Sequence, residues 1–397
     1  MNLLKYHPYS YLFFSGIVNG IGDRFSQVAV LTLVLHITGS GLAVGAVLGI
    51  RILPFLLLAP LGGKLADRLN KKCLLMATDL LRIPFALSFL FVKSKEDLWI
   101  VFVGVIALSC GEAFYLPVRK STIAEITDKT ILIKVNGMEQ LILGIVLIGG
   151  SITGGVVAFL LGNQFAFVLN ACSFLAAALL IRKLSVKNKS QTLVESRVAR
   201  GSFSKGISIF VIVAVILQTI TATMDGVFNV LISVYGAQTF KLDELGVGLL
   251  YGSLGTGLIF SFLVTGRLTK NFLLIGMVAL IAESIFQIVA SQVDNFLQLS
   301  LLFVSISFIG GVGGASVDTL IMQQIPKGKQ GRVFGLIEAI LNIQIGLVMF
   351  GTGIILENVH AQKAGWIGGS IGLVGAVLLL IIYGLILMSY RNNESVG

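Results

Sequence analysis

The stretch GGKLADRLNKK, from Gly62 to Lys72, interrupts two long apolar runs with one acid and four bases. Charged side chains are costly inside a bilayer, so a short charged segment between apolar runs indicates a turn at a membrane surface. Gly62 and Gly63 remove side chains at the end of the first run, which lets a neighbouring helix approach closely. The stretch therefore predicts a tight turn between two membrane-spanning helices.

The composition supports this interpretation. The chain has 397 residues, of which 56% are hydrophobic and only 12% are charged, with a mean hydropathy of +0.95. Its apolar runs are mostly long enough to cross a hydrocarbon core of about 30 Å as helices, and they lack the alternation of barrel strands. The first run carries Asp23 and Arg24 mid-run, so we expect it to remain as a span. The sequence predicts an all-α polytopic membrane protein.

The apolar runs predict twelve spans, which would place both termini on one side of the membrane. The expected spans cover residues 9–36, 40–66, 73–93, 98–118, 135–160, 163–182, 206–235, 245–266, 272–291, 296–322, 332–356 and 364–389.

The formal net charge of +10 reflects topology in this interpretation. Of the 29 Lys and Arg residues, roughly 22 fall on the side of the N-terminus, about 4 on the other side and about 3 inside spans. The positive-inside rule then places both termini in the cytoplasm and the protein in the cell membrane. A nucleic-acid partner is not needed to explain the basic excess.

The chain divides into two similar halves. The one long polar stretch, at 184–205, predicts a basic cytoplasmic linker between a bundle of residues 1–183 and a bundle of residues 206–397. Asp23 and Asp225 occupy corresponding positions in the two halves, as do Gly63 and Gly266. Matches in the same order at an offset of about 200 residues predict two pseudo-symmetric six-helix bundles.

These features together resemble the major facilitator superfamily of secondary transporters. The signature residues between the second and third spans are Gly63, Leu65, Ala66, Asp67, Arg68, Lys71 and Lys72. The resemblance implies that this loop is a cytoplasmic latch that favours the outward-open state. Asp67 could face the positive N-terminal end of a helix from the other half.

Three further residues belong with this loop. Asn70 stands where the family usually has Gly, and we expect it to keep the turn through a left-handed conformation. Asp79 and Arg82 lie one turn apart on the third span, so we expect them to pair with each other near the latch.

A narrower resemblance comes from the first 140 residues. The segments GDRFSQVAVLTLVLHITGSGLAVG, RILPFLLLAPLGGKLADR, DLLR and YLPVRKS are similar to the branch of macrolide efflux pumps and the enterobactin exporter. This resemblance implies efflux of an amphipathic small organic molecule, such as a drug, a macrolide or a siderophore, by proton antiport.

Ionisable residues inside spans are candidates for proton coupling, because each costs about 2.5–3.5 kcal/mol on insertion scales. Asp23 is the strongest candidate, and its helix face also carries Asn19 and Gln27. Arg51 lies at mid-bilayer, and we expect it to pair with Asp23. The matching face of the seventh span carries the candidates Thr221, Asp225, Asn229 and Ser233. The two stripes predict one central cavity, unless these groups only satisfy one another in helix packing.

Four more carboxyl groups lie in the spans. Glu112 is deep enough to bind a proton or cation. Glu283 is equally deep, but in a span that we expect to be peripheral. Glu139 and Glu338 lie near cytoplasmic ends in corresponding positions of the two halves. Their placement predicts a role in gating.

Other functional classes have little support. The three Cys and three His residues are scattered, which predicts no metal site and no disulfide framework. No nucleotide-binding element is visible, so we expect no cofactor and no enzymatic activity. The leading hypothesis is a monomeric, proton-coupled exporter whose partners are a small-molecule substrate, protons and the lipid bilayer. The alternatives are a lipid or lysophospholipid flippase and, from another class, a transport-inactive sensor.

Overall fold

A computed structural model describes residues 7–39, 41–161, 163–184, 209–326 and 328–394 of the chain. The described residues fold into helices joined by short turns and contain no strand. The predicted linker at 184–205 lies outside the described residues, apart from its first residue.

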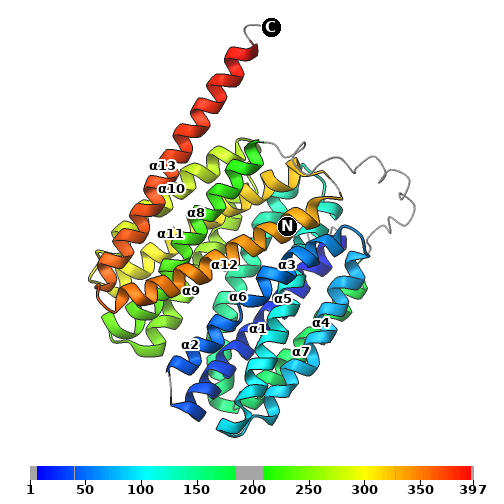
Figure 1. Cartoon of the computed structure of the whole chain (residues 1–397). Helices are drawn as coiled ribbons and strands as arrows, with labels where there is room; N and C mark the ends of the chain where they lie inside the picture. Colours follow the sequence, from blue (N-terminus) through cyan, green and yellow to red (C-terminus); the bar gives the residue numbers. More distant parts are fainter. Residues whose placement is uncertain (1–6, 40, 162, 185–208, 327, 395–397) are drawn as a thin grey trace. The chain divides into compact units, whose positions relative to one another are not determined.

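The first half of the chain forms a series of apolar helices (Figure 1). They are α1 (His7–Thr38), α2 (Gly41–Ile50), α3 (Leu53–Ala66), α4 (Lys71–Ser88), α5 (Leu98–Ile126), α6 (Leu132–Leu161) and α7 (Asn163–Arg182), with the short 3-10 helices η2 (Phe89–Phe91) and η3 (Lys95–Asp97) between α4 and α5.

The second half repeats this pattern. Its helices are α8 (Ile209–Ser233), the π-helix η6 (Val234–Thr239), α9 (Asp243–Thr265), α10 (Phe272–Ala290), α11 (Phe296–Gln324), α12 (Gln330–Leu356) and α13 (Ala361–Glu394). Within the described residues, 10 helices are long and apolar enough to cross a membrane, and α3 is a shorter apolar helix. These 10 helices are α4 to α13, without the short helices. Helix α1 corresponds to the first predicted span, and α2 and α3 together correspond to the second, so the helices follow the twelve predicted spans.

The chain divides into two compact units. The first contains α1 to α7 and the start of α12 up to Ile343, and the second contains α8 to α11, the rest of α12 and α13. In the first unit α1 packs on α6 and α7, α4 packs on α5 and α7, and α3 packs on α5. In the second unit α11 packs on α9 and α10, and α13 packs on α8 and α10.

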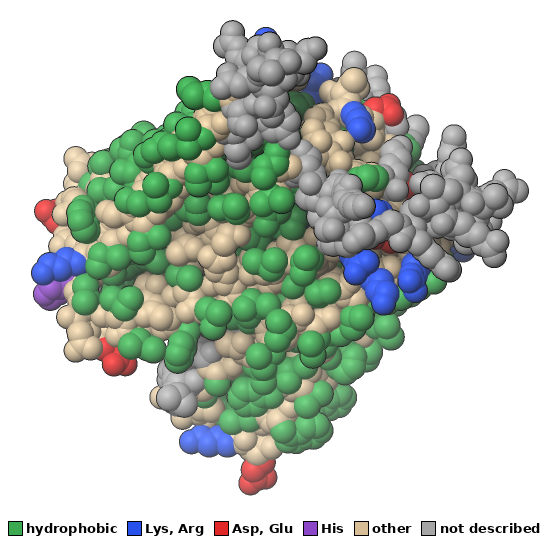
Figure 2. Space-filling view, turned by 45° about the horizontal axis from the view of Figure 1, so that its top comes forward, with side chains coloured by type: hydrophobic (Ala, Val, Ile, Leu, Met, Phe, Trp, Pro, Cys, Tyr) green, Lys and Arg blue, Asp and Glu red, His purple; other side chains and the backbone are tan. Residues whose placement is uncertain are grey.

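Many large apolar side chains are exposed on the helices, among them Leu57, Leu81 and Phe350. Figure 2 shows apolar side chains across most of the visible face, with charged side chains near its margins. Exposed apolar surface on this scale is unfavourable in water and suits contact with lipid.

The predicted second span is not one continuous helix. It breaks at Arg51 and Ile52, between α2 and α3. Pro54 explains the break, because it lies in the first turn of α3 and lacks the N–H that would bond the carbonyl of Ile50, the last residue of α2. Arg51 therefore lies in an interruption of the span.

The conformation predicted for Asn70 is wrong. Asn70 is the N-cap of α4 with an extended backbone, φ −68° and ψ 110°. Its side-chain oxygen accepts hydrogen bonds from the backbone N–H groups of Lys72 at 3.0 Å and Cys73 at 3.3 Å. The amide side chain is used to cap the helix, and the turn needs no left-handed residue at this position.

Candidate functional site

A cavity with charged walls lies inside the first unit. It contains roughly 430 Å³ of empty space, part of it open to solvent. Helices α1, α2, α4 and α5, with the break after α2 and the η2 turn, supply its walls. The lining residues are Asp23, Ser26, Gln27, Val30, Leu31, Val47, Arg51, Arg82, Phe89, Val105, Leu108 and Glu112.

Arg82 of α4 forms an ion pair with Asp23 of α1. Its Nη2 atom donates to Oδ1 at 3.0 Å and to Oδ2 at 2.8 Å. The side chain of Arg82 is only 4% exposed, whereas that of Asp23 is 26% exposed. The guanidinium lies over the ring of Phe174, 4.3 Å from its centroid, a favourable contact for a cation. The pair therefore places both the carboxylate and its counter-charge at the cavity wall, and the arginine is the more buried of the two.

A buried chain of polar groups continues from this pair. Arg82 Nη1 donates to Asn19 Oδ1 at 3.4 Å, and Asn19 Nδ2 donates to Asp79 Oδ1 at 2.7 Å. Asp79 Oδ2 is buried and has no hydrogen-bond partner among the described residues. Asn19, predicted to line the cavity, is instead buried behind it. The network thus joins two carboxyl groups through one arginine and one amide.

A second ion pair lines the same cavity. Arg51 Nη2 lies 3.2 Å from Glu112 Oε2, with the two side chains 30% and 33% exposed. The predicted pairing of Asp23 with Arg51 is therefore wrong, because Arg82 of α4 holds Asp23. The predicted pairing of Asp79 with Arg82 is also wrong, because the hydrogen bond of Asp79 comes from Asn19.

The charges around this cavity balance. The ionisable residues that line it are two acids, Asp23 and Glu112, and two bases, Arg51 and Arg82. Gln27 also lines the cavity, and its Oε1 accepts a hydrogen bond from Arg24 Nη1 at 3.2 Å. With the lining charges balanced, one added proton or one bound organic cation would give the cavity a net charge.

The signature turn between α3 and α4 contacts the first turn of α12. Asp67 Oδ1 accepts a hydrogen bond from the backbone N–H of Gly331 at 2.8 Å, and its Oδ2 accepts one from Arg332 at 2.9 Å. These donors belong to the helix N-terminus, where N–H groups have no partner within the helix and the macrodipole favours an anion. Burial raises the pKa of Asp67, while the bonds from Arg332 and Gly331 oppose that shift.

Glycine residues allow this contact to form. A Cβ added at Gly63 would clash with the carbonyl oxygen of Gly331, and it would lie 3.0 Å from Gly335 Cα. A Cβ added at Gly335 would clash with the carbonyl oxygen of Ala59. The α3 and α12 backbones therefore approach as closely as helices can, and Gly63, Gly331 and Gly335 form what we call the glycine contact.

The bases of the signature separate into two groups. Lys71 is buried, lies 2.7 Å from Glu125 Oε2 and donates to the carbonyl of Ser121 at 3.1 Å. Arg68 is exposed and Lys72 is half-buried. Lys71 therefore ties the turn to α5 and has a structural part in holding Asp67 in place.

The two glutamates predicted to act in gating are held by neighbouring residues of α5. Glu139 accepts from Arg119 Nε at 2.9 Å, from Arg119 Nη2 at 3.0 Å and from the Tyr9 hydroxyl at 2.6 Å. Glu338, in the first part of α12, lies 2.9 Å from Lys120 Nζ. Both carboxylates therefore have a positive partner from the same helix.

In the second unit, the predicted polar stripe on α8 mostly bonds within its own helix. Thr221 donates to the carbonyl of Leu217, and Asn229 donates to the carbonyl of Asp225. Ser233 is exposed at the end of α8. The Asp225 side chain is half-buried. The described residues thus leave the role of this stripe a prediction.

Several residues of these networks escaped sequence reasoning. Arg119, Tyr9 and Gln344 are not among the site residues that the sequence predicts. Gln344 Nε2 donates to Thr223 Oγ1 at 2.6 Å and to the carbonyl of Thr219 at 3.0 Å. A signal for Arg119 was available, since it lies close to the end of an apolar run, with Glu139 on the next predicted span.

A polytopic helical fold, with paired charges inside its spans and a glycine contact at a charged turn, defines the class of secondary transporters. A sequence model described as the Major Facilitator Superfamily matches residues 12–347 and 214–389. The chain belongs to the Major Facilitator Superfamily, and it is a multi-pass membrane transporter of small molecules, not an enzyme.

Known proteins agree with this assignment. The uncharacterized MFS-type transporter YfiS of Bacillus subtilis (strain 168) is 23% identical over 395 residues, covering 93% of this chain and 89% of YfiS. The class G tetracycline resistance protein of Vibrio anguillarum is 24% identical over 355 residues, covering 85% of each chain. The human organic anion transporter MFSD10 (TETRAN) has a TM-score of 0.74 at 12% identity, covering 94% of this chain and 99% of MFSD10, a likeness of fold alone.

Proposed function

We propose that this transporter exports amphipathic small organic molecules in exchange for protons, by alternating access. The observation that carries the proposal is the ion pair of Asp23 and Arg82 at the wall of a cavity in the first unit. A similar protein confers tetracycline resistance by its name, which supports a substrate of this class.

Asp23 is the proton carrier in this proposal. Protonation of Asp23 would break its ion pair, and Arg82 would keep its contacts with Asn19 and Phe174. Arg51 and Glu112 also line the cavity and form a second pair that a charged substrate could separate. Because proton and substrate would change the same balanced set of charges, each would alter the free energy of binding the other.

Asp67 has a separate role in the proposal, as a latch. Its carboxylate binds the N-terminal turn of α12, and a contact made in only one conformation biases the equilibrium toward that conformation. Asp79 lies behind Arg82 and would position it. Glu139 and Glu338 would control the rate of gating through their pairs with Arg119 and Lys120.

We also propose the topology and domain organisation expected from the sequence. Both termini would face the cytoplasm of a bacterial cell, bundles 1–183 and 206–397 would move against each other, and the protein would act as a monomer. The basic residues of the predicted linker and loops support the orientation.

The test uses purified protein in proteoliposomes, with tetracycline as the first substrate, in the presence and absence of an imposed pH gradient. We expect Asp23→Asn to retain downhill movement of substrate and to lose accumulation against a gradient. Glu96→Gln, a carboxyl-to-amide change at an exposed residue of the η3 turn, is the matched control and should transport as wild type does. Asp225→Asn should have a milder effect than Asp23→Asn.

Accumulation by Asp23→Asn at the wild-type level would show that Asp23 is structural. Glu112 and Asp225 would then be the next coupling candidates. Movement of a labelled lysophospholipid between leaflets, without proton movement, would favour the flippase alternative. If no tested substrate moves but ligands still bind, the protein would be a sensor.

A further inference from the structure

Two buried polar atoms of α4 have no hydrogen-bond partner among the described residues of the chain. One is the Nε donor of Arg82, and the other is the Oδ2 acceptor of Asp79. Both residues are buried, and residues three positions apart on a helix are neighbours on its surface. A donor and an acceptor that could satisfy each other therefore lie one turn apart on the same helix.

The amide of Asn19 on α1 bridges the same two side chains. Its Oδ1 atom accepts a hydrogen bond from Arg82 Nη1 at 3.4 Å, and its Nδ2 atom donates to Asp79 Oδ1 at 2.7 Å. One amide group thus separates the guanidinium from the carboxyl group of Asp79. The bonds from Arg82 to Asp23, at 3.0 and 2.8 Å, hold the guanidinium toward α1 in this arrangement.

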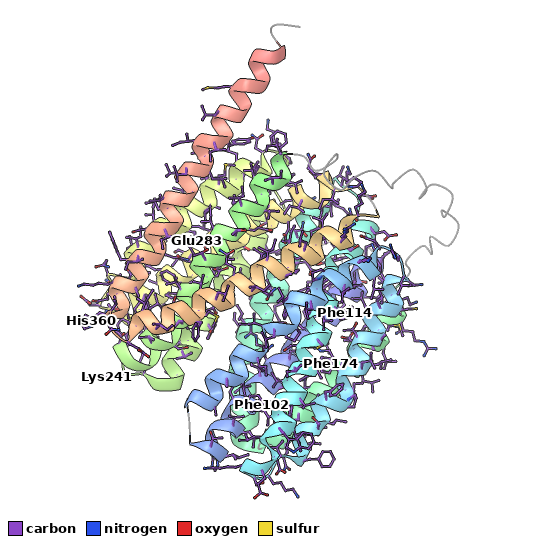
Figure 3. All side chains as sticks on the ribbon, in the orientation of Figure 1. Phe102, Phe114, Phe174, Lys241, Glu283 and His360 are labelled. Carbon is purple, nitrogen blue, oxygen red and sulfur yellow. The ribbon has the colours of Figure 1, made fainter. Side chains whose placement is uncertain are left out.

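The remaining contacts of Arg82 supply no negative charge. A Cβ added at Gly111 of α5 would lie 2.6 Å from Arg82 Cδ, so the stem of the arginine packs against a helix that has no side chain at this position. The ring of Phe174 on α7, labelled in Figure 3, lies 4.3 Å from the guanidinium carbon. These contacts enclose the side chain but do not replace a carboxylate.

The other charged groups nearby already have partners. The ionisable groups of neighbouring helices that act on the two residues include Asp23 of α1 and Glu112, Tyr115 and Arg119 of α5. Glu112 is paired with Arg51 at 3.2 Å, and Arg119 is paired with Glu139 at 2.9 Å. Asp79 makes no ion pair within the described ranges and is held only by the amide of α1. It is the acid of this set that lacks a counter-charge.

A buried cation needs a counter-charge, because a low-dielectric interior does not stabilise an unpaired ion. Protonation of Asp23, the step proposed above, would remove the counter-charge of Arg82. We propose that Arg82 then exchanges partners and pairs with Asp79, so that Asp79 is the positioning residue for the arginine whenever Asp23 carries a proton. Asn19 can keep its bond to Oδ1 of Asp79 during the exchange, because Oδ2 is the oxygen that has no partner.

The exchange would change the wall of the cavity. Asp23 and Arg82 both line it, so one proton would neutralise the acid and turn the base toward Asp79. With Asp23 protonated and Arg82 paired with Asp79, these three side chains carry no net charge. The use of this exchange in transport rests on the proposed function. The exchange itself does not, and it can be measured without substrate or gradient.

The experiment is solid-state nuclear magnetic resonance of the purified protein in lipid, with arginine nitrogens and aspartate carboxyl carbons isotopically labelled to detect contacts between them. Asp23→Asn stands in for protonated Asp23, and we expect it to retain a close contact between an arginine side chain and an aspartate carboxyl. Adding Asp79→Asn should abolish this contact. Adding Asp318→Asn instead, at a carboxyl group of α11 that accepts a hydrogen bond from Gln218 at 2.9 Å, is the matched control and should leave the contact in place.

A pH titration covers the case in which the double variant folds poorly. In the wild type the contact should persist as the pH falls through the range in which Asp23 takes up its proton. In Asp79→Asn the contact should disappear over that range, because Arg82 has no second carboxylate to receive it.

Unfolding measurements in detergent give an independent readout. Asp79→Asn should lower the folding equilibrium constant about tenfold more in the Asp23→Asn background than in the wild type, since the two residues share a partner. Absence of the contact in Asp23→Asn would overturn the proposal, as would equal costs of Asp79→Asn in the two backgrounds. A protein that shows the exchange but moves no substrate would count against the proposed function and leave this inference standing.

Discussion

A single nitrogen of Arg82 binds both carboxylate oxygens of Asp23, across a sequence separation of 59 residues. The two partners differ in their access to water, since Arg82 is 4% exposed and Asp23 is 26% exposed. The cost of losing either partner should therefore depend on which charge stays behind.

Neutralising either Asp23 or Arg82 should destabilise the protein by breaking a buried ion pair. Asp23→Asn leaves a buried cation without its partner, at about 3 kcal/mol, the lower end of the range for breaking a buried pair. Arg82→Gln should cost at least as much, about 3 kcal/mol, because it also removes the buried contacts of the guanidinium with Asn19 and Phe174. The double variant should cost less than the sum. The measurement is the free energy of unfolding in mixed detergents, analysed as a double-mutant cycle, and additive costs would contradict the pairing.

The importance of the glycine contact can be tested by comparing two glycine-to-alanine substitutions on α12, one inside the contact and one outside it. Gly335→Ala adds a methyl group that would clash with the carbonyl oxygen of Ala59, whereas at Gly351, also on α12, an added Cβ meets nothing within 4 Å. We expect Gly335→Ala to cost about 1–3 kcal/mol of unfolding free energy through overpacking. Gly351→Ala should be neutral or slightly stabilising. Equal effects of the two substitutions would mean that the close approach of α3 and α12 is unimportant.

Asp67→Asn should loosen the first turn of α12. The amide keeps one acceptor oxygen but turns an NH2 group toward the second backbone donor, so one of the two hydrogen bonds is lost. We expect faster hydrogen–deuterium exchange at the amides of Gly331 and Arg332, by about tenfold for a loss of 1.4 kcal/mol. Lys72→Gln, a change at a half-buried base of the same turn, is the control. Unchanged exchange in Asp67→Asn would argue against the latch.

Glu139 and Glu338 should differ in their effects on stability. Arg119, which binds Glu139, is 8% exposed, whereas Lys120, which lies beside Glu338, is 26% exposed. Glu139→Gln should cost about 3 kcal/mol, because Arg119 would remain buried without its counter-charge. Glu338→Gln should cost about 1 kcal/mol or less. Thermal unfolding of the two variants distinguishes them, and a larger loss for Glu338→Gln would contradict this ranking.

The sequence predicts the fold well, because hydropathy and charge asymmetry report directly on which segments enter a bilayer. The break in the second span is not visible in the apolar run alone. It follows from Pro54, which cannot donate a hydrogen bond to the carbonyl of Ile50. The contact made by Asp67 could be anticipated as binding to a helix N-terminus. The sequence did not predict that this helix would be α12, because Asp67 and its two partners are 264 and 265 positions apart in the chain.

Ion pairing was predicted less well. The position of a residue along a helix indicates its depth in the membrane and the side of the helix on which it lies. The partner of Asp23 depends also on which helices pack side by side, and a single sequence does not reveal this. Arg51 and Arg82 are both arginines inside spans, and depth favoured Arg51. In the structure Arg51 meets Glu112, and Arg82 reaches α1. Glu283 was expected to lie in a peripheral span, and in the structure its side chain is buried.

The pair of Asp23 and Arg82 also constrains how the protein is made. Ribosomes add about 5–20 residues per second, so Asp23 is synthesised roughly 3 to 12 s before the arginine 59 residues later. During that interval α1 carries an uncompensated carboxylate, which disfavours its release into lipid by about 2.5–3.5 kcal/mol. The first helix is therefore best released into the bilayer together with α4, which makes insertion of these spans a cooperative event during biosynthesis.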